Sequence, residues 1–117
     1  MIAYGLAIVL NLFVVYMGAQ FFLRPEAAVA GYGVPSKQSV YVTIKGLRDL
    51  SYGILGLALI AFADARAVAI FMLVVAINPL GDTLIVLRNG GTKATAFGIH
   101  FSTAVIVLID AVLLFLV

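Results

Sequence analysis

Residues 67–87 read AVAIFMLVVAINPLGDTLIVL, an apolar run in which Asp82 is the only charged side chain. A transmembrane α-helix needs about 20 consecutive apolar residues, because the hydrocarbon core of a bilayer is about 30 Å thick. The run therefore predicts a membrane-spanning helix. It also places a carboxylate and a helix-breaking residue, Pro79, inside the span, and we expect the helix to kink there.

The rest of the chain has the same character. Of its 117 residues, 65% are hydrophobic and 10% are charged, whereas a soluble domain is about 45–50% apolar and about 25% charged. This composition excludes an ordinary soluble domain. The apolar runs predict an all-α integral membrane protein, a four-transmembrane-helix bundle with spans at residues 2–23, 41–63, 67–87 and 94–117. The four spans form a single domain, residues 1–117.

The segment after the first span predicts a short interfacial helix. Pro25 can begin such a helix over residues 26–30, with Gly31 closing it. Aromatic residues near the span ends, namely Phe21, Phe22, Tyr32 and Tyr41, are interpreted as interfacial anchors. There are no cysteines and the formal net charge is only +2, which excludes thiolate metal sites and disulfides and gives no indication of a nucleic-acid partner.

The basic residues between the predicted spans indicate an orientation in the membrane. Arg24, Lys37, Arg88 and Lys93 lie in loops 1–2 and 3–4, whereas loop 2–3 holds Arg66 alone. Cytoplasmic loops carry an excess of Lys and Arg. We therefore expect loops 1–2 and 3–4 to be cytoplasmic, both termini to lie outside, and the membrane to be a bacterial inner membrane.

Five charged side chains and one histidine fall inside the predicted spans: Lys45, Arg48, Asp49, Asp82, Asp110 and His100. A charged group at the bilayer centre costs about 2.5–3.5 kcal/mol on insertion scales, so these groups need partners or water. At 1.5 Å per residue, all except Asp110 lie about 6–12 Å from the cytoplasmic ends of their helices. They therefore form one cluster that can be close to neutral, and we expect mutual ion pairing.

Helical periodicity adds neutral polar residues to this cluster. Tyr52 shares a helix face with Lys45, Arg48 and Asp49, Asn78 lies one turn before Asp82, and Thr103 lies on the face of His100. In the outer half of the bundle, Asn11 is the natural partner of Asp110.

These residues suggest a site for acid/base chemistry. Asp82, His100 and Asp49 are the candidate catalytic groups, and Lys45, Arg48, Tyr52, Asn78 and Thr103 are the candidate ligand-binding groups. The alternatives are an ion-pair network that only joins helices, a static hydrogen bond between Asp82 and His100, and snorkelling of the two cations to the headgroups. No metal and no cofactor is expected, because one histidine and scattered carboxylates lack the spacing of a di-metal bundle.

The chain resembles a small four-helix bacterial and fungal membrane-protein family of unknown function that is related to the DoxX-like superfamily. The motifs behind the resemblance are Arg24-Pro25-Glu26, Gly31-Tyr32-Gly33-Val34-Pro35, Lys45-Gly46-Leu47-Arg48-Asp49, Pro79-Leu80-Gly81-Asp82 and His100. The resemblance implies a four-helix membrane bundle. It implies no agreed activity, because the superfamily mixes accessory subunits of quinone-linked enzymes with uncharacterised proteins.

Two functions from different classes follow from the pattern. The first is a membrane enzyme whose cytoplasm-facing pocket isomerises a lipophilic small molecule or opens its epoxide. The second is a non-catalytic accessory subunit that binds a lipid or quinone, with proton-coupled transport as a third and weaker reading. The expected partners are membrane lipid and the lipophilic small molecule. The small residues Ala94, Gly98 and Ser102 suit either a homodimer contact with a second copy of the chain or close packing against a neighbouring helix of the same bundle.

Overall fold

The computed structural model describes residues 2–33 and 40–117, and this part of the chain is helical apart from short turns. The helices are α1 (Ile2–Leu23), α2 (Pro25–Tyr32), α3 (Val40–Phe62), α4 (Ala65–Val75), α5 (Ile77–Arg88), α6 (Lys93–Thr95), the π-helix η1 (Ala96–Phe101) and α7 (Ser102–Phe115). Lys37, which contributes to the predicted orientation, lies outside the described residues.

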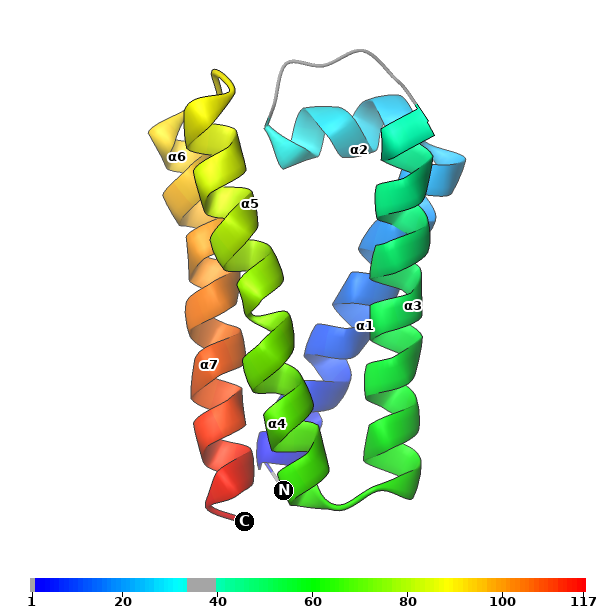
Figure 1. Ribbon diagram of the computed structural model, residues 1–117, viewed down its shortest axis with the longest axis vertical. Helices are drawn as coiled ribbons and strands as arrows, with labels where there is room; N and C mark the ends of the chain where they lie inside the picture. Colours follow the sequence, from blue (N-terminus) through cyan, green and yellow to red (C-terminus); the bar gives the residue numbers. More distant parts are fainter. Residues whose placement is uncertain (1, 34–39) are drawn as a thin grey trace.

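The long helices form two packed groups with an open angle between them (Figure 1). Helix α1 packs along α3, while α4 and α5 pack along α7 and η1. Helix α1 runs from α7, near the chain termini, to α2 at the opposite end. Both termini and the α3–α4 turn lie at one end, and α2 lies across the other end, over the space between α3 and α5.

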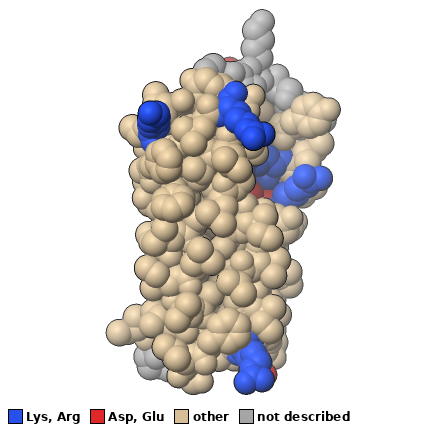
Figure 2. Space-filling model, turned by 60° about the vertical axis from the view of Figure 1, so that its left-hand side comes forward, with Lys and Arg blue, Asp and Glu red and all other residues tan. Residues whose placement is uncertain are grey.

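Three helical segments are long and apolar enough to cross a membrane: Ile2–Phe21, Ala65–Arg88 and Lys93–Phe115. Helix α3 has 23 residues, but its first half carries Lys45, Arg48 and Asp49. The molecule is 42 Å long, close to the roughly 40–45 Å thickness of a bilayer with its headgroups. Figure 2 shows cations near both ends of one face, separated by a wide uncharged band. The described chain thus has the form of a helical membrane protein.

Small residues hold the helices together near the termini. The buried core there consists of Ala3, Ala7, Val68, Ala69, Met72, Ala76, Val107, Ala111 and Leu114. Small side chains allow helix backbones to approach closely, which favours association in lipid through van der Waals contact.

Glycines allow the same close approach between α1 and α3. A Cβ atom added at Gly18 would lie 2.8 Å from the carbonyl oxygen of Gly46 and 2.9 Å from the Cα of Leu50. A Cβ at Gly53 would lie 2.9 Å from the carbonyl oxygen of Asn11. Because these neighbours are backbone atoms, a side chain at either position would push the two helices apart.

The run at residues 67–87 is interrupted as predicted. Helix α4 ends at Val75 and α5 begins at Ile77. The break falls one turn before Pro79, which has no N–H to donate to the carbonyl of Val75. The predicted irregularity is therefore present as a break in the helix at Ala76, six residues before Asp82.

Two segments differ from the sequence-based expectation. Helix α2 continues through Gly31 to Tyr32 and ends at Gly33, whose φ of 94° is left-handed. Gly33 takes this role because its Cα faces the Thr95 side chain, where a Cβ would collide. The segment predicted as one helix at residues 94–117 consists of α6, η1 and α7, so a π-turn separates its two α-helical parts.

The α1–α3 contact generates a prediction about stability. Gly18→Ala should lower the free energy of unfolding by about 1–3 kcal/mol, the usual range for an overpacked contact. Thermal unfolding in detergent, followed by circular dichroism, measures the change as a lower Tm.

Gly5→Ala is the matched control, because a Cβ at Gly5 has no described neighbour within 4 Å. Replacing an exposed helical glycine by alanine should be neutral or stabilising by up to about 1 kcal/mol. Equal Tm values for the two variants would contradict the proposed helix contact.

Candidate functional site

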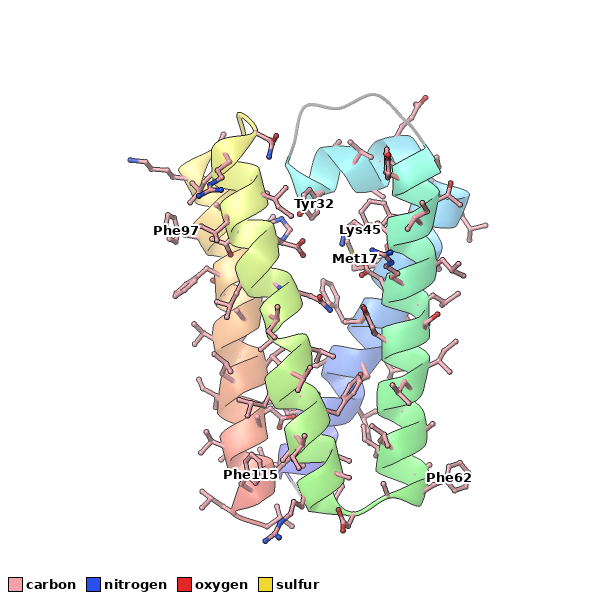
Figure 3. The ribbon with its side chains drawn as sticks, in the orientation of Figure 1. Met17, Tyr32, Lys45, Phe62, Phe97 and Phe115 are labelled. Carbon is pink, nitrogen blue, oxygen red and sulfur yellow. The ribbon has the colours of Figure 1, made fainter. Side chains whose placement is uncertain are left out.

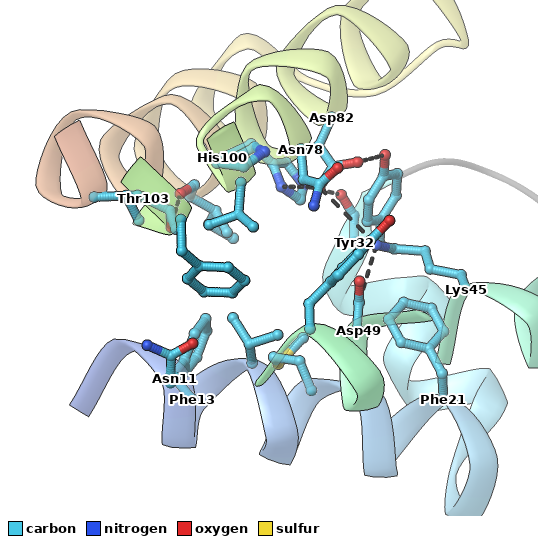
Figure 4. Close-up of a pocket in the computed structure, with 18 residues that line it drawn as sticks. Asn11, Phe13, Phe21, Tyr32, Lys45, Asp49, Asn78, Asp82, His100 and Thr103 are labelled. Carbon is cyan, nitrogen blue, oxygen red and sulfur yellow. Dashed lines mark hydrogen bonds and ion pairs between the residues drawn. The ribbon is translucent and has the colours of Figure 1, made fainter. Parts of the chain in front are cut away.

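The candidate site is a cavity of about 120 Å³ enclosed by α1, α3, the α4–α5 pair and η1–α7 (Figure 4). Most of its wall is apolar and is formed by Phe13, Val14, Met17, Phe71, Val75 and Val107, among others. Its polar residues gather near α2, where Tyr32, Lys45, Asp49, Asp82 and His100 line it. Figure 3 shows Tyr32, Lys45 and Met17 pointing into the space between the helix groups, while Phe62 points outward.

Lys45 is the central cation of this group. Its Nζ lies 3.1 Å from Oδ2 of Asp49, one turn later on α3, and 3.9 Å from Oδ2 of Asp82 on α5. The ammonium therefore joins the two helix groups at the level where they diverge. The ion pairing expected from the charge balance is confirmed for Lys45, Asp49 and Asp82.

Tyr32, at the end of α2, contacts both charges of the Lys45–Asp82 pair. Its hydroxyl donates a hydrogen bond of 2.7 Å to Oδ1 of Asp82. The Lys45 Nζ lies 5.1 Å from the centroid of the Tyr32 ring and 5.2 Å from that of Phe21, within cation–π distance of both. Burial, followed by the hydrogen bond to Asp82, raises the pKa of the Tyr32 phenol above its ordinary value, so the phenol stays a donor.

His100 completes the group from the π-helix η1. Its Nε2 lies 2.8 Å from the backbone carbonyl oxygen of Tyr32, which can only accept a hydrogen bond, so Nε2 carries a proton. Its Nδ1 is turned to Asp82, with Nδ1 and Oδ2 separated by 3.9 Å. The ring also packs on that of Tyr32, at 4.6 Å between centroids. In the neutral imidazole, Nδ1 is therefore the basic nitrogen, and it faces the carboxylate.

The position of Tyr32 depends on how α2 is anchored. Gly33, the residue after Tyr32, lies against Thr95, and a Cβ at Gly91 would collide with the carbonyl oxygen of Gly33. Gly91 belongs to the turn between α5 and α6. Two glycines from distant segments thus let the end of α2 dock on this turn, which places Tyr32 over Asp82 and His100.

The charges of the cluster almost cancel. Lys45 contributes one positive charge and Asp49 and Asp82 two negative charges, so the group carries one negative charge with neutral His100 and none when His100 is protonated. The arrangement can therefore hold one exchangeable proton between Asp82 and Nδ1 of His100. Among the described residues no three His, Asp or Glu side chains gather as a metal site would require.

The remaining candidate residues line the same cavity, with the exception of Arg48. Tyr52, Asn78 and Thr103 line the cavity, and the Thr103 hydroxyl donates a 2.6 Å hydrogen bond to the carbonyl of Ile99. Arg48 is exposed and lines an outer groove instead. Arg48 follows Lys45 by three residues, and this rotation of about 60° on the helix turns it from the cavity.

The interpretation of Tyr32 and Phe21 as interfacial anchors is wrong. Both rings are turned toward Lys45, Phe21 from the end of α1 and Tyr32 from α2, which folds back across the end of the bundle. Gly33, directly after Tyr32, was the signal in the sequence for close packing there, because a Cβ at Gly33 would collide with Thr95, whereas a Cβ at Gly31 would have no neighbour within 4 Å. Tyr41 is 75% exposed, and the side chain of Phe22 lies outside the described part of the chain.

The predicted pairing of Asn11 with Asp110 is also wrong. The Asn11 amide donates to the carbonyl of Ala7 at 2.8 Å and contacts the Met72 sulfur at 3.6 Å. It is turned to α3, where Gly56 leaves room for its oxygen. Asp110 is completely buried, and its two carboxyl oxygens have no hydrogen-bond partner among the described residues.

Comparison with known proteins gives a family but no activity. No curated protein and no solved structure gives a significant match to the chain. Residues 11–114 match a family described as a domain of unknown function (DUF4267). The match covers the cavity and all of the Lys45 cluster, which consists of Tyr32, Lys45, Asp49, Asp82 and His100. The chain therefore belongs to this family.

Proposed function

We propose that the protein crosses the membrane four times and that its inner cavity carries out acid/base chemistry, an isomerisation or an epoxide opening, on a lipophilic small molecule. The observation that carries this proposal is the placement of the two ring nitrogens of His100. Its Nε2–H is held by a backbone carbonyl, so its Nδ1 faces Asp82 at the polar end of a cavity whose wall is mostly apolar. Fixing one imidazole nitrogen in this way leaves the other to accept and return a proton.

The residues suit the steps of an isomerisation. The Lys45 ammonium polarises an oxygen of the substrate, and Asp49 positions that ammonium through the 3.1 Å ion pair. Nδ1 of His100 takes a proton from one carbon, and a proton returns to another carbon as the double bond shifts. No proton is gained or lost overall.

The same residues suit an epoxide opening. Nδ1 of His100 takes a proton from the attacking water, and Lys45 gives a proton to the epoxide oxygen as its C–O bond breaks. The proton on His100 then returns to Lys45 by way of Asp82, which lies 3.9 Å from both groups, so epoxide and water give a diol and the protein regains its starting state.

Helix α3 is the fourth span of this proposal. It is as long as α1 and packs along it, and Lys45 and Asp49 are turned toward the cavity. Charged residues of membrane helices face the bundle interior or water in this way. We further propose a bacterial inner membrane, with both termini outside and the end that carries α2 at the cytoplasm.

We also propose a relation to the DoxX-like superfamily, which rests on the resemblance of the motifs Lys45-Gly46-Leu47-Arg48-Asp49 and Pro79-Leu80-Gly81-Asp82 alone.

A non-catalytic accessory subunit that binds a lipid or quinone is the second candidate. The Tyr32–Asp82 hydrogen bond and the Lys45–Asp49 ion pair favour it. Polar groups that already bind one another can form the wall of a binding site without taking part in a reaction. A homodimer remains a proposal as well, supported by the exposure of Ala94 and Gly98 on the outer face.

The enzyme proposal predicts which variants lose turnover. The protein purified in nanodiscs is incubated with the lipophilic molecules that copurify, and products are followed over time by mass spectrometry. His100→Gln keeps a donor for the Tyr32 carbonyl but removes the base, and Asp82→Asn removes the carboxylate that faces Nδ1. Each of these single variants should lower turnover by about 10²–10⁴-fold.

Glu26→Gln is the matched control for Asp82→Asn, because Glu26 is exposed on α2. It should keep the wild-type rate. Wild-type turnover by folded His100→Gln and Asp82→Asn proteins would contradict the proposal, and a molecule that stays bound without conversion would favour the accessory subunit.

The four-span orientation has a separate test, because the absence of cysteine makes any introduced cysteine unique. Arg24→Cys, Arg66→Cys and Lys93→Cys are labelled in intact cells with a membrane-impermeant maleimide. Arg66→Cys should react directly, while Arg24→Cys and Lys93→Cys should react only after lysis. Reaction of Arg24→Cys and Arg66→Cys from the same side would show that α3 does not cross.

A further inference from the structure

A second hollow adjoins the inner cavity. It is a groove of about 460 Å³ between α3 and α5, with walls that include Tyr41, Ile44, Arg48, Ile77 and Ile85. Six residues line both hollows: Tyr32, Lys45, Asp49, Tyr52, Asn78 and Asp82. The Lys45 cluster is therefore a shared wall, with one compartment on each side of it.

The groove lies between α3 and α5, and Tyr41, Ile77 and Ile85 expose apolar surface along it. In a bundle where α3 spans the membrane, such a surface faces the hydrocarbon. A molecule dissolved in the bilayer reaches the cluster through the groove without entering water.

The charge of the groove points to the kind of molecule. Both carboxylates, Asp49 and Asp82, lie within ion-pair distance of Lys45. Arg48 is the other cation that lines the groove. Among the described residues it takes part in neither of these ion pairs. Arg48 lies about 12 Å along α3 from its first residue, within the span, at 1.5 Å per residue. A guanidinium there binds carboxylate or phosphate oxygens in a planar, bidentate manner.

The two volumes limit the size of the reacting part. The inner cavity of about 120 Å³ is close in size to the roughly 150 Å³ of an engineered apolar cavity that takes up benzene. It therefore suits a short chain or a single small ring better than a sterol, a quinone ring with its tail, or the two chains of a phospholipid.

We infer that the ligand is a single-chain or monocyclic lipophilic acid that enters from the bilayer through the groove. Its anionic group binds Arg48 in the groove, and its apolar end passes the Lys45 cluster into the inner cavity. This inference rests on the proposed function and adds the substrate class. It makes Arg48 a specificity-determining residue that holds the acid group, whereas His100 and Asp82 act on the carbons beyond it.

Binding of octanoate and of 1-octanol to the protein in phosphatidylcholine nanodiscs tests the inference, with bound molecules counted by native mass spectrometry. Wild-type protein should prefer octanoate, and Arg48→Gln should weaken octanoate binding by about tenfold to a hundredfold, as expected for a hydrogen bond to a charged group. Octanol binding should not change. Arg48→Lys should restore part of the preference, and Lys93→Gln, which removes a cation remote from the groove, should leave it intact.

Two further arms separate the alternatives. Adamantaneacetate, whose rigid cage is bulkier than the octanoate chain, should bind more weakly than octanoate, and equal binding would overturn the two-compartment arrangement.

Nanodiscs that contain phosphatidylglycerol test a lipid headgroup as the source of the anion. Retention of this lipid through Arg48, with no preference for octanoate, would overturn the proposed acid.

Because these experiments measure binding, their outcome is independent of the acid/base step. Loss of octanoate preference in Arg48→Gln stands even if His100 and Asp82 prove dispensable for turnover. Conversely, unchanged octanoate binding in Arg48→Gln would overturn the role of Arg48 and leave the proposed chemistry open to its own test.

Discussion

The half of the molecule that carries α2 depends on the neutralisation of Lys45. An ammonium group among apolar helices is expensive unless opposite charges and polarisable groups surround it. Asp49 supplies the nearest charge from the same helix, Asp82 supplies another from α5, and the rings of Tyr32 and Phe21 lie within cation–π distance. These four contacts draw residues from four helices toward one point.

The other structural features near the cavity support this arrangement. Helix α5, which begins after the break at Ala76, carries Asp82 at the cavity wall, and the docking of Gly33 on the α5–α6 turn places Tyr32. The π-turn of η1 carries His100, in keeping with the frequent occurrence of such turns at functional sites. These contacts together position the polar end of the cavity.

The sequence was sufficient for features that depend on local spacing. Apolar runs and the 1.5 Å rise placed the helices and showed that Lys45, Asp49, Asp82 and His100 share one depth, and Pro79 marked the interruption. It was insufficient where tertiary contacts decide. Tyr32 enters the site because α2 folds back onto Thr95 and Gly91, and Asn11 turns to Gly56 rather than to Asp110. Neither choice is encoded in periodicity.

The π-turn also determines which changes in chain length the protein can accept. Its i to i−5 bonds, such as that from Ser102 N–H to the Phe97 carbonyl, fit one more residue into the turn than α-helical spacing allows. Deleting one residue between 96 and 101 would let this turn close with α-helical i to i−4 bonds and would change the phase of the flanking helices little. A deletion in the regular part of α7 has no such reserve, so it would rotate the residues on its two sides by about 100° relative to each other. Homologous chains that differ by one residue within this last span should therefore differ at η1, and those that lack a residue there should have a continuous α-helix.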